Sequence, residues 1–404
     1  MLIGLIIALI VGVIVGTITG LIPGIHINLV SVLLLSVLNF FLNLTEPITL
    51  AVFIVAMSIS DVFISFIPSI FLGAPDEDTV LSILPGHEML NKGKAYEAVI
   101  LTLYGSASAI IIILILSPIF IYFLPMVYPY INNIMPFILI VASGFLFYFE
   151  KTNKLWAIII FLLAGFLGIA TLNLNLKESL LPLLTGLFGA SSLITSMMKK
   201  QKIPEQQVAS LKDIKIKKKS LFRALFASLI ASPFCCFLPG LGSGQAAVLG
   251  SEVTGDLDRK EFLILLGSIN TIVMGLSFVT LYSVEKSRTG AAVAVSKLLT
   301  NFTFSDLLVL LGVIFISGVA AFFLTLFLAK IFSRRISKFS YNKLSLAILI
   351  FLSIIILIFS GFLGFLVFIV SAFLGLATIF LGIRRIHLMG CLLLPTILFY
   401  LPFI

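Results

Sequence analysis

Residues 20–26 read Gly-Leu-Ile-Pro-Gly-Ile-His, and residues 237–244 read Phe-Leu-Pro-Gly-Leu-Gly-Ser-Gly. Each stretch interrupts a run of apolar residues with a proline followed directly by a glycine. Proline lacks a backbone N–H and glycine admits positive φ, so each pair can end one helix and let the next begin. The sequence therefore predicts helices that are broken at two places, once in each half of the chain.

The composition around these breaks is that of an integral membrane protein. Of the 404 residues, 60% are apolar and 11% are charged, whereas a soluble domain has about 25% charged residues. A water-soluble enzyme, a disordered chain and a nucleic-acid-binding domain are excluded on this ground. The net charge of +9 comes largely from a polar run, Lys199 to Lys219, which we interpret as a cytoplasmic loop. We expect a multi-pass protein of the cell membrane.

A helix that crosses a bilayer needs about 20 apolar residues. Candidate apolar segments lie at 1–22, 27–44, 47–73, 97–124, 130–149, 155–173, 178–198, 221–238, 241–253, 261–283, 290–303, 305–332, 344–360, 361–383 and 387–404. The basic clusters between them, including the pair Arg384 and Arg385, can all be cytoplasmic under two conditions. The segments around Pro23 and Pro239 must each enter and leave on one side, and 290–303 must not cross.

Under these conditions each half has an odd number of crossings, so the two halves point in opposite directions. The expected fold is an all-α, polytopic transmembrane protein with two inverted-topology repeats, each with a broken or re-entrant helix hairpin. Residues 1–198 would form the first repeat, 199–220 a basic cytoplasmic loop, and 221–404 the second repeat. Secondary transporters are commonly built this way, with the substrate held near the midplane between broken helices.

The helix that begins after each break would present unpaired N–H groups and a positive dipole end, which together favour an anion. Alternatively, both motifs are proline kinks packed by small residues. Their matching places in the two halves favour the functional interpretation. The predicted substrate-binding residues are Pro23, Gly24, His26, Asn28, Pro239, Gly240, Gly242, Ser243, Gly244 and Gln245, with Asn270 in the matching crossing of the second half.

Two polar residues inside apolar segments have alternative roles. Asp61 is an ionisable residue at membrane depth, and such residues are functional candidates by default. It could carry a coupling proton or sodium ion, or its carboxyl could be hydrogen-bonded to a neighbouring helix. Asn270 could contact substrate or sodium, or could hold two helices together.

A second set of motifs resembles a known family. Leu72-Gly73-Ala74-Pro75 is followed by residues 85–98, Pro-Gly-His-Glu-Met-Leu-Asn-Lys-Gly-Lys-Ala-Tyr-Glu-Ala. Together they resemble the first-half signature of the large membrane subunit of tripartite tricarboxylate transporters, which has a Pro-Gly-Thr-Pro turn and a later Lys/Gly-Arg-Ala-Gly-Glu-Ala segment. Residues 238–242 are similar to the family's Leu-Pro-Gly-Leu/Ala-Gly turn. The chain is shorter than this subunit usually is, and we interpret it as a divergent archaeal-type permease.

This chain departs from the family pattern at Asp76-Glu77-Asp78, where the family has small and hydroxyl residues. Three carboxylates beside a polyanion site would repel the substrate. They therefore lie at the membrane face, or the substrate differs, or Asp76 and Asp78 bind a coupling cation as Asp61 could. The resemblance also implies partners, namely a small membrane subunit and an extracytoplasmic binding protein.

The sequence thus predicts a secondary active transporter that moves a di- or tricarboxylate-like anion, coupled to a proton or sodium gradient. An alternative is a flippase for a phosphorylated polyprenyl lipid carrier, which could use the same helix-end anion site. No catalytic residues, metal site or cofactor are expected beyond Na⁺ or H⁺, and no nucleic-acid partner. The sequence does show His87-Glu88, but Asn91 stands where a metalloprotease needs its second histidine. Membrane lipid is an expected contact, and the sequence leaves a homodimer open.

Overall fold

The computed structural model of the chain describes residues 2–22, 45–73, 79–148, 150, 152–176, 179–198, 204–214, 216–237, 243–255, 257–286, 289–337 and 341–401. Every regular element within these ranges is helical, and they contain no strand. The predicted all-α membrane fold is therefore confirmed. The inverted relation of the two halves and their boundaries at 198 and 221 stay predictions.

Seven helices in this part of the chain are long and apolar enough to cross a membrane. They are α1 (Leu2–Leu21), α4 (Pro47–Ile64) continued by α5 (Phe66–Leu72), α7 (Ala95–Tyr148), α8 (Lys154–Asn173), α13 (Arg259–Val284), α15 (Phe304–Ile336) and α16 (Tyr341–Phe380). The remaining elements are shorter or more polar. They are η1 (Val80–Ser82), α6 (Ile83–Leu90), α9 (Leu180–Leu184), the π-helix η2 (Thr185–Ala190), α10 (Ser191–Met198), α11 (Lys218–Phe237), α12 (Ser243–Val253), α14 (Gly290–Leu298), η3 (Arg385–Met389) and α17 (Gly390–Tyr400).

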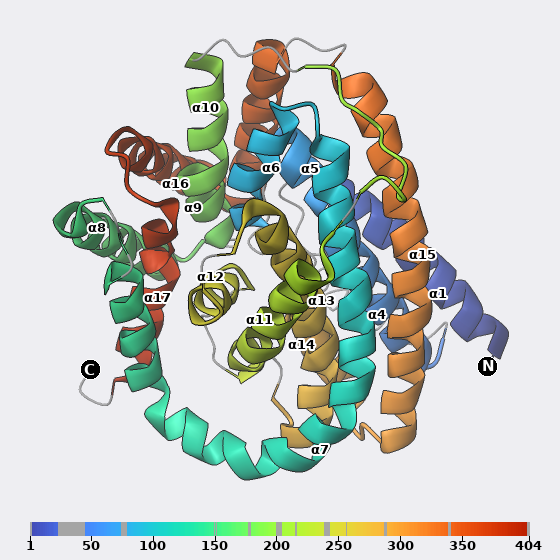
Figure 1. Ribbon diagram of the computed structural model, residues 1–404. Helices are drawn as coiled ribbons and strands as arrows, with labels where there is room; N and C mark the ends of the chain where they lie inside the picture. Colours follow the sequence, from blue (N-terminus) through green and yellow to red (C-terminus); the bar gives the residue numbers. More distant parts are fainter. Residues whose placement is uncertain are drawn as a thin grey trace.

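Two central helices, α4 and α13, are almost entirely buried. Both are apolar around their whole circumference, as expected for helices enclosed by other helices. Helices α1 and α15 pack on α4, and α7 and α11 pack on α13. Figure 1 shows this group on one side of the molecule, with α1 at its periphery. Leu2 and Ile3 of α1 are more than two-thirds exposed, as befits a helix facing lipid.

Small residues let these helices approach closely. On α1, a Cβ atom at Gly12 would lie 2.6 Å from the carbonyl oxygen of Phe53, and one at Gly16 would lie 2.2 Å from that of Met57. The four-residue spacing puts both glycines on the face that meets α4, which is a small-xxx-small crossing. The α7–α13 contact works likewise, because a Cβ at Gly267 would lie 2.1 Å from a carbonyl of α7.

The apolar segments predicted at 97–124 and 130–149 are not two helices. They form one continuous helix, α7, of 54 residues, with prolines inside it at 118, 125, 129 and 136. Proline bends a helix but need not end it when the neighbouring turns remain helical. Figure 1 shows α7 descending beside α13 and then curving below the molecule toward α8. The curved part links the central group to the helices on the other side.

A second group contains α8, α16, α17 and the segment from α9 to α10. A Cβ at Gly168 would lie 2.0 Å from the carbonyl oxygen of Cys391, which brings α8 against the start of α17. The π-helix η2 packs on α16, where a Cβ at Gly375 would lie 2.2 Å from the carbonyl oxygen of Leu187. Helix α16 is interrupted at Gly361, whose φ of 67° breaks the helix at the predicted boundary between 344–360 and 361–383.

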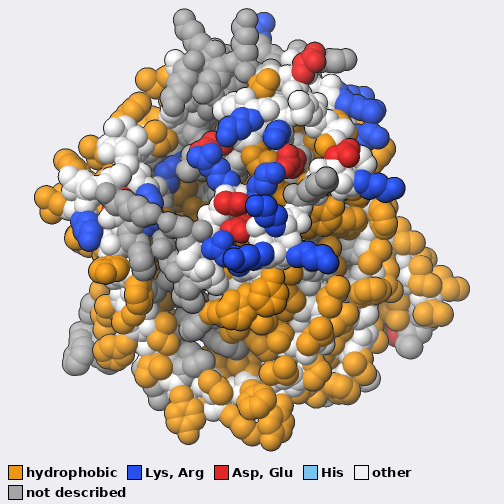
Figure 2. All heavy atoms as spheres, in the orientation of Figure 1, with side chains coloured by type: hydrophobic (Ala, Val, Ile, Leu, Met, Phe, Trp, Pro, Cys, Tyr) orange, Lys and Arg blue, Asp and Glu red, His pale blue; other side chains and the backbone are white. Residues whose placement is uncertain are grey.

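Charged side chains gather at one end of the molecule, above a large apolar area (Figure 2). Three successive residues at the start of α13 form ion pairs with three different helices. Arg259 pairs with Glu88 of α6 at 2.5 Å, Lys260 pairs with Glu97 of α7 at 2.5 Å, and Glu261 pairs with Arg223 of α11 at 3.3 Å. The start of α13 thus ties together helices from both halves of the chain.

Candidate functional site

Most of the predicted break residues lie outside the part of the chain that the structure describes. This holds for Pro23, Gly24, His26, Asn28, Pro239, Gly240 and Gly242, and for the ion-coupling candidates Asp76 and Asp78. Their roles stay predictions. The described flanks of the two breaks are the end of α1 and the start of α12, which contains Ser243, Gly244 and Gln245.

The start of α12 is buried inside the protein. Ser243 is 1% exposed, and a Cβ at Gly244 would lie 3.2 Å from Leu81 of η1 and 3.5 Å from Met389 of η3. The amino terminus of a helix carries unpaired N–H groups and partial positive charge. In this protein that terminus lies against η1 and η3, among residues far apart in the sequence.

The helix α6, close to η1, carries a buried histidine. Gly73 ends α5 with a φ of 66°, and a Cβ there would lie 2.6 Å from Cε1 and 2.7 Å from Nε2 of His87. The two residues belong to different parts of the signature noted in the sequence. Burial, and then the positive charge of Arg385, lower the pKa of His87 from 6.5 to about 4. The imidazole is therefore neutral at physiological pH.

Arg385 of η3 lies against the π-helix. Its Nη1 donates to Ser192 Oγ at 2.6 Å, and its Nη2 donates to Ser191 Oγ at 3.0 Å and to the carbonyl oxygens of Leu187 and Phe188. The guanidinium also lies over the Phe188 ring, 5.4 Å from its centre. A carbonyl oxygen has two lone pairs, so η2 can bind the arginine without losing its own hydrogen bonds. π-helical turns often occur at functional sites.

All these partners of Arg385 are neutral, and within the described ranges no carboxylate lies within ion-pair distance of it. The expectation that the pair Arg384 and Arg385 serves topology is wrong for Arg385, which lies deep in the protein. Arg384 behaves differently, because its Nε donates to Glu150 Oε2 at 3.3 Å.

Glu150, between α7 and α8, anchors η3 from the other side. Its carboxylate accepts from Nε2 of His387 at 2.7 Å and from the backbone N–H and hydroxyl of Thr152, and the His387 ring stacks on Phe147. Burial alone would raise the pKa of Glu150, but the hydrogen bonds from Thr152 and His387 outweigh it and lower the pKa to about 2. This anionic anchor fixes the position of the neighbouring Arg385.

Asp61 and Asn270 lie on the two central helices. The hydroxyl of Thr19, near the end of α1, donates to Asp61 Oδ1 at 2.7 Å, and both residues are buried. Asp61 is thus held close to the first break. Asn270 is buried in α13, two residues beyond Ser268, whose hydroxyl is 2.9 Å from that of Ser228 on α11.

Sequence comparison completes the description of the site. Residues 6–390 match the profile described as the Tripartite tricarboxylate transporter TctA family. The chain belongs to the TctA family. An uncharacterized protein of Methanocaldococcus jannaschii is 32% identical to it over 360 residues, which cover 86% of this chain and 88% of the relative. No solved structure shows significant similarity to the chain.

Membership in the TctA family confirms the resemblance and the divergent archaeal type. The protein is a multi-pass membrane permease of the tripartite tricarboxylate transporter type, and such systems contain further subunits and a binding protein. Its signature segment Met89–Ala98 spans the end of α6 and the start of α7. Gly93 in that turn has a φ of 73°, and its carbonyl accepts from the N–H of Gln207 at 2.8 Å. The basic loop thus covers the signature segment.

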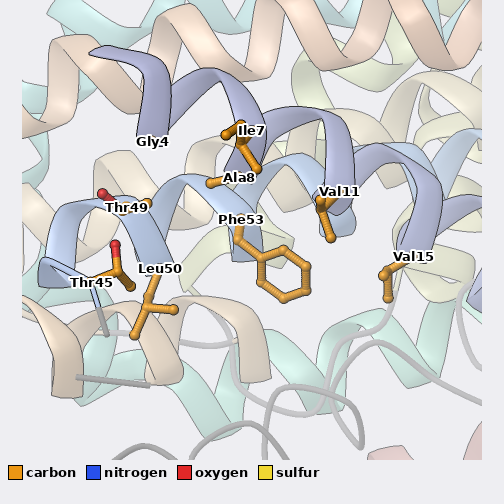
Figure 3. Close-up of a pocket in the computed structure, with 9 residues that line it drawn as sticks. All are labelled: Gly4, Ile7, Ala8, Val11, Val15, Thr45, Thr49, Leu50 and Phe53. Atoms are coloured by element: carbon orange, nitrogen blue, oxygen red, sulfur yellow. The ribbon is translucent and has the colours of Figure 1, made fainter. Parts of the chain in front are cut away.

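A separate apolar pocket of about 440 Å³ lies between α1 and α4. Figure 3 shows Val11 and Val15 of α1 and Phe53 of α4 around it, with the hydroxyls of Thr45 and Thr49 at one end. None of its lining residues is charged. The pocket therefore lacks the donors that an anion requires and is distinct from the buried basic region around Arg385.

The residues that sequence reasoning missed are those that surround Arg385. Ser191 and Ser192 lie in an apolar segment where small residues usually serve packing, and no sequence pattern marks a π-helix. One signal was present, since Arg385 begins an apolar segment in which an ionisable residue is a functional candidate.

Proposed function

We propose that this TctA-family chain is a secondary active permease of the cell membrane for a small di- or tricarboxylate-like anion. A proton or sodium gradient would drive it, and the substrate would lie between the two Pro-Gly breaks. Family membership supports the transporter class. The predicted inverted repeat would place both breaks near the membrane midplane.

The observation that carries the proposal is the position of the second break's flank. The amino terminus of α12, with Ser243 and Gly244, lies inside the protein against η1 and η3. A helix amino terminus exposed at the membrane surface would be hydrated by water. An interior one needs another partner for its N–H groups, and an anion satisfies both their hydrogen bonds and their charge.

Asp61 is the best-supported candidate for the coupling ion. Its carboxylate is buried in α4 and is held by Thr19 at the end of α1. A proton or a sodium ion bound there would act directly on the helix that leads into the first break. Asn270, at a similar depth on α13, would then contribute an amide to the substrate.

The tripartite organisation suggests how the substrate arrives. An extracytoplasmic binding protein would capture the anion and deliver it to the permease, and a small membrane subunit would complete the complex. The expected assay therefore needs two arms, one with this chain alone and one with the binding protein added.

The proposal is tested by uptake of labelled citrate and succinate into proteoliposomes, with sodium and proton gradients imposed separately. We expect gradient-dependent uptake in at least one arm, and a several-fold lower uptake for Ser243→Ala. Ser210→Ala, an exposed serine of the basic loop, is the matched control and should transport normally. If correctly inserted protein takes up neither acid in either arm, the carboxylate permease is refuted and phosphorylated lipid becomes the substrate to test.

A further inference from the structure

Arg385 has hydrogen-bond partners but no counter-charge among the described residues. Two serine hydroxyls and two backbone carbonyls hold Nη1 and Nη2, and the Phe188 ring covers one face of the group. None of these groups carries a negative charge. Burying an arginine without a negative partner is strongly unfavourable, so such residues are rare and are usually functional.

The guanidinium also keeps an unused donor. Nε is buried and makes no hydrogen bond to any described residue. A guanidinium has five N–H groups, all donors, and cannot lose its proton in a protein. One N–H and a full positive charge therefore remain to be satisfied, and a carboxylate oxygen would satisfy both with a short charge-assisted hydrogen bond.

The position of Arg385 fits a ligand rather than a structural role. The side chain lies deep in the protein, yet part of the residue's surface stays accessible. The other end of η3, at Met389, touches Gly244 at the start of α12. The arginine thus lies on the same short element that meets the flank of the second break.

The neighbouring groups favour a carboxylate over a phosphate. His87, the titratable group of α6 that senses the charge of Arg385, is neutral at physiological pH. The positive charge of Arg384 is directed to Glu150. A single positive charge among neutral hydroxyls and an aromatic ring suits one monoanionic carboxylate, whereas a phosphate dianion is usually bound by several cations.

We propose that Arg385 is a substrate-binding residue that takes one carboxylate of the transported anion, held in place by Ser191, Ser192 and the carbonyls of η2. This inference rests on the proposed function and adds to it a binding residue outside the Pro-Gly breaks. The anchor formed by Glu150 and His387 then acts as a positioning device, because it fixes η3 from the side opposite to η2.

The test measures citrate binding to the purified full-length chain, by calorimetry and by thermal stabilisation. Arg385→Gln should raise the Kd for citrate about 10- to 100-fold, the range for loss of a hydrogen bond to a charged group. Arg385→Lys should fall between the two, because it keeps the charge without the planar fork. Arg335→Gln, which makes the same chemical change at the exposed end of α15, should leave the Kd unchanged.

A second measurement uses the unaltered protein and so does not depend on the folding of a variant. Phenylglyoxal modifies accessible guanidinium groups, and mass spectrometry of peptides follows each arginine separately. Citrate should slow the modification of Arg385 several-fold and leave that of Arg335 unchanged, and inorganic phosphate at the same concentration should not protect. Equal protection by phosphate would refute the carboxylate assignment.

The outcomes separate this inference from the function on which it rests. If the wild-type chain binds citrate but neither Arg385→Gln nor citrate protection shows an effect, Arg385 is not a binding residue and the permease proposal stands. If the wild-type chain binds no carboxylate at all, with or without the binding protein, both proposals are wrong.

Discussion

Replacing Gly73 by alanine should lower the free energy of unfolding by about 3 kcal/mol, for two separable reasons. The backbone at Gly73 has a φ of 66°, a left-handed conformation that costs an L-residue roughly 1 kcal/mol. The new Cβ would also lie 2.6 Å from His87 Cε1, so the buried ring has to move by about 1 Å to regain a normal contact. Overpacking of this kind costs about 1–3 kcal/mol.

The measurement is a double-mutant cycle, with unfolding in mixed micelles followed by circular dichroism. Removing the ring in a His87→Ala background should reduce the cost of Gly73→Ala to about 1 kcal/mol, because only the backbone term remains. Gly382 supplies a matched control. Its φ is 68° and nothing lies within 4 Å of a Cβ placed there, so Gly382→Ala should also cost about 1 kcal/mol.

A result that contradicts this reasoning is easily recognised. If Gly73→Ala costs the same in both backgrounds, or no more than Gly382→Ala, then the contact between Gly73 and His87 does not constrain the two signature segments. The close approach of α5 and α6 would then have no energetic consequence, and His87 would be free to move relative to Arg385.

Three further perturbations test other parts of the structure. The pKa of Glu150 is about 2 rather than 4.5, so the ionised carboxylate should stabilise the fold by about 3 kcal/mol above pH 4.5 and lose this contribution as the pH falls toward 2; the stability gap between wild type and Glu150→Gln, measured by unfolding at each pH, should narrow over that range. Gly267→Val should cost about 3 kcal/mol, because its Cβ would lie 2.1 Å from a backbone carbonyl of α7, whereas Gly312→Val, with open space around it, should be nearly neutral in the same unfolding assay. Asp61→Asn should abolish gradient dependence of uptake while citrate binding persists, and Thr19→Val should weaken the ion dependence less; unchanged ion dependence in both would exclude this pair from coupling.

Hydropathy alone predicted most of the long helices. The segments 1–22, 155–173 and 261–283 correspond within two residues at each end to α1, α8 and α13. These helices are bounded by polar or broken sequence, so length and composition suffice to locate them. The bent helix α7 was missed because proline has two effects that sequence does not separate. Proline can end a helix or only curve it, and the packing of the neighbouring turns decides which occurs.

The candidate site was predictable only in part. The sequence correctly identified two family signatures, and the structure places Ser243 and Gly244 at the start of a buried helix. Arg385 could not be recognised as part of the site, because its environment is assembled from η2, α10 and η3, which are nearly 200 residues apart in the chain. Whether an arginine beside a membrane segment faces water or the interior depends on tertiary packing, which local composition does not encode.

The π-helix makes the length of its segment as important as its side chains. A π-turn is the local result of one additional residue in an α-helix, so deleting a residue between Thr185 and Ala190 would restore regular α-helical geometry. Each residue of an α-helix turns the chain by about 100°, and the deletion would rotate Ser191 and Ser192 away from Arg385. Single-residue insertions and deletions in this short stretch, with every polar side chain retained, would therefore change what the permease recognises.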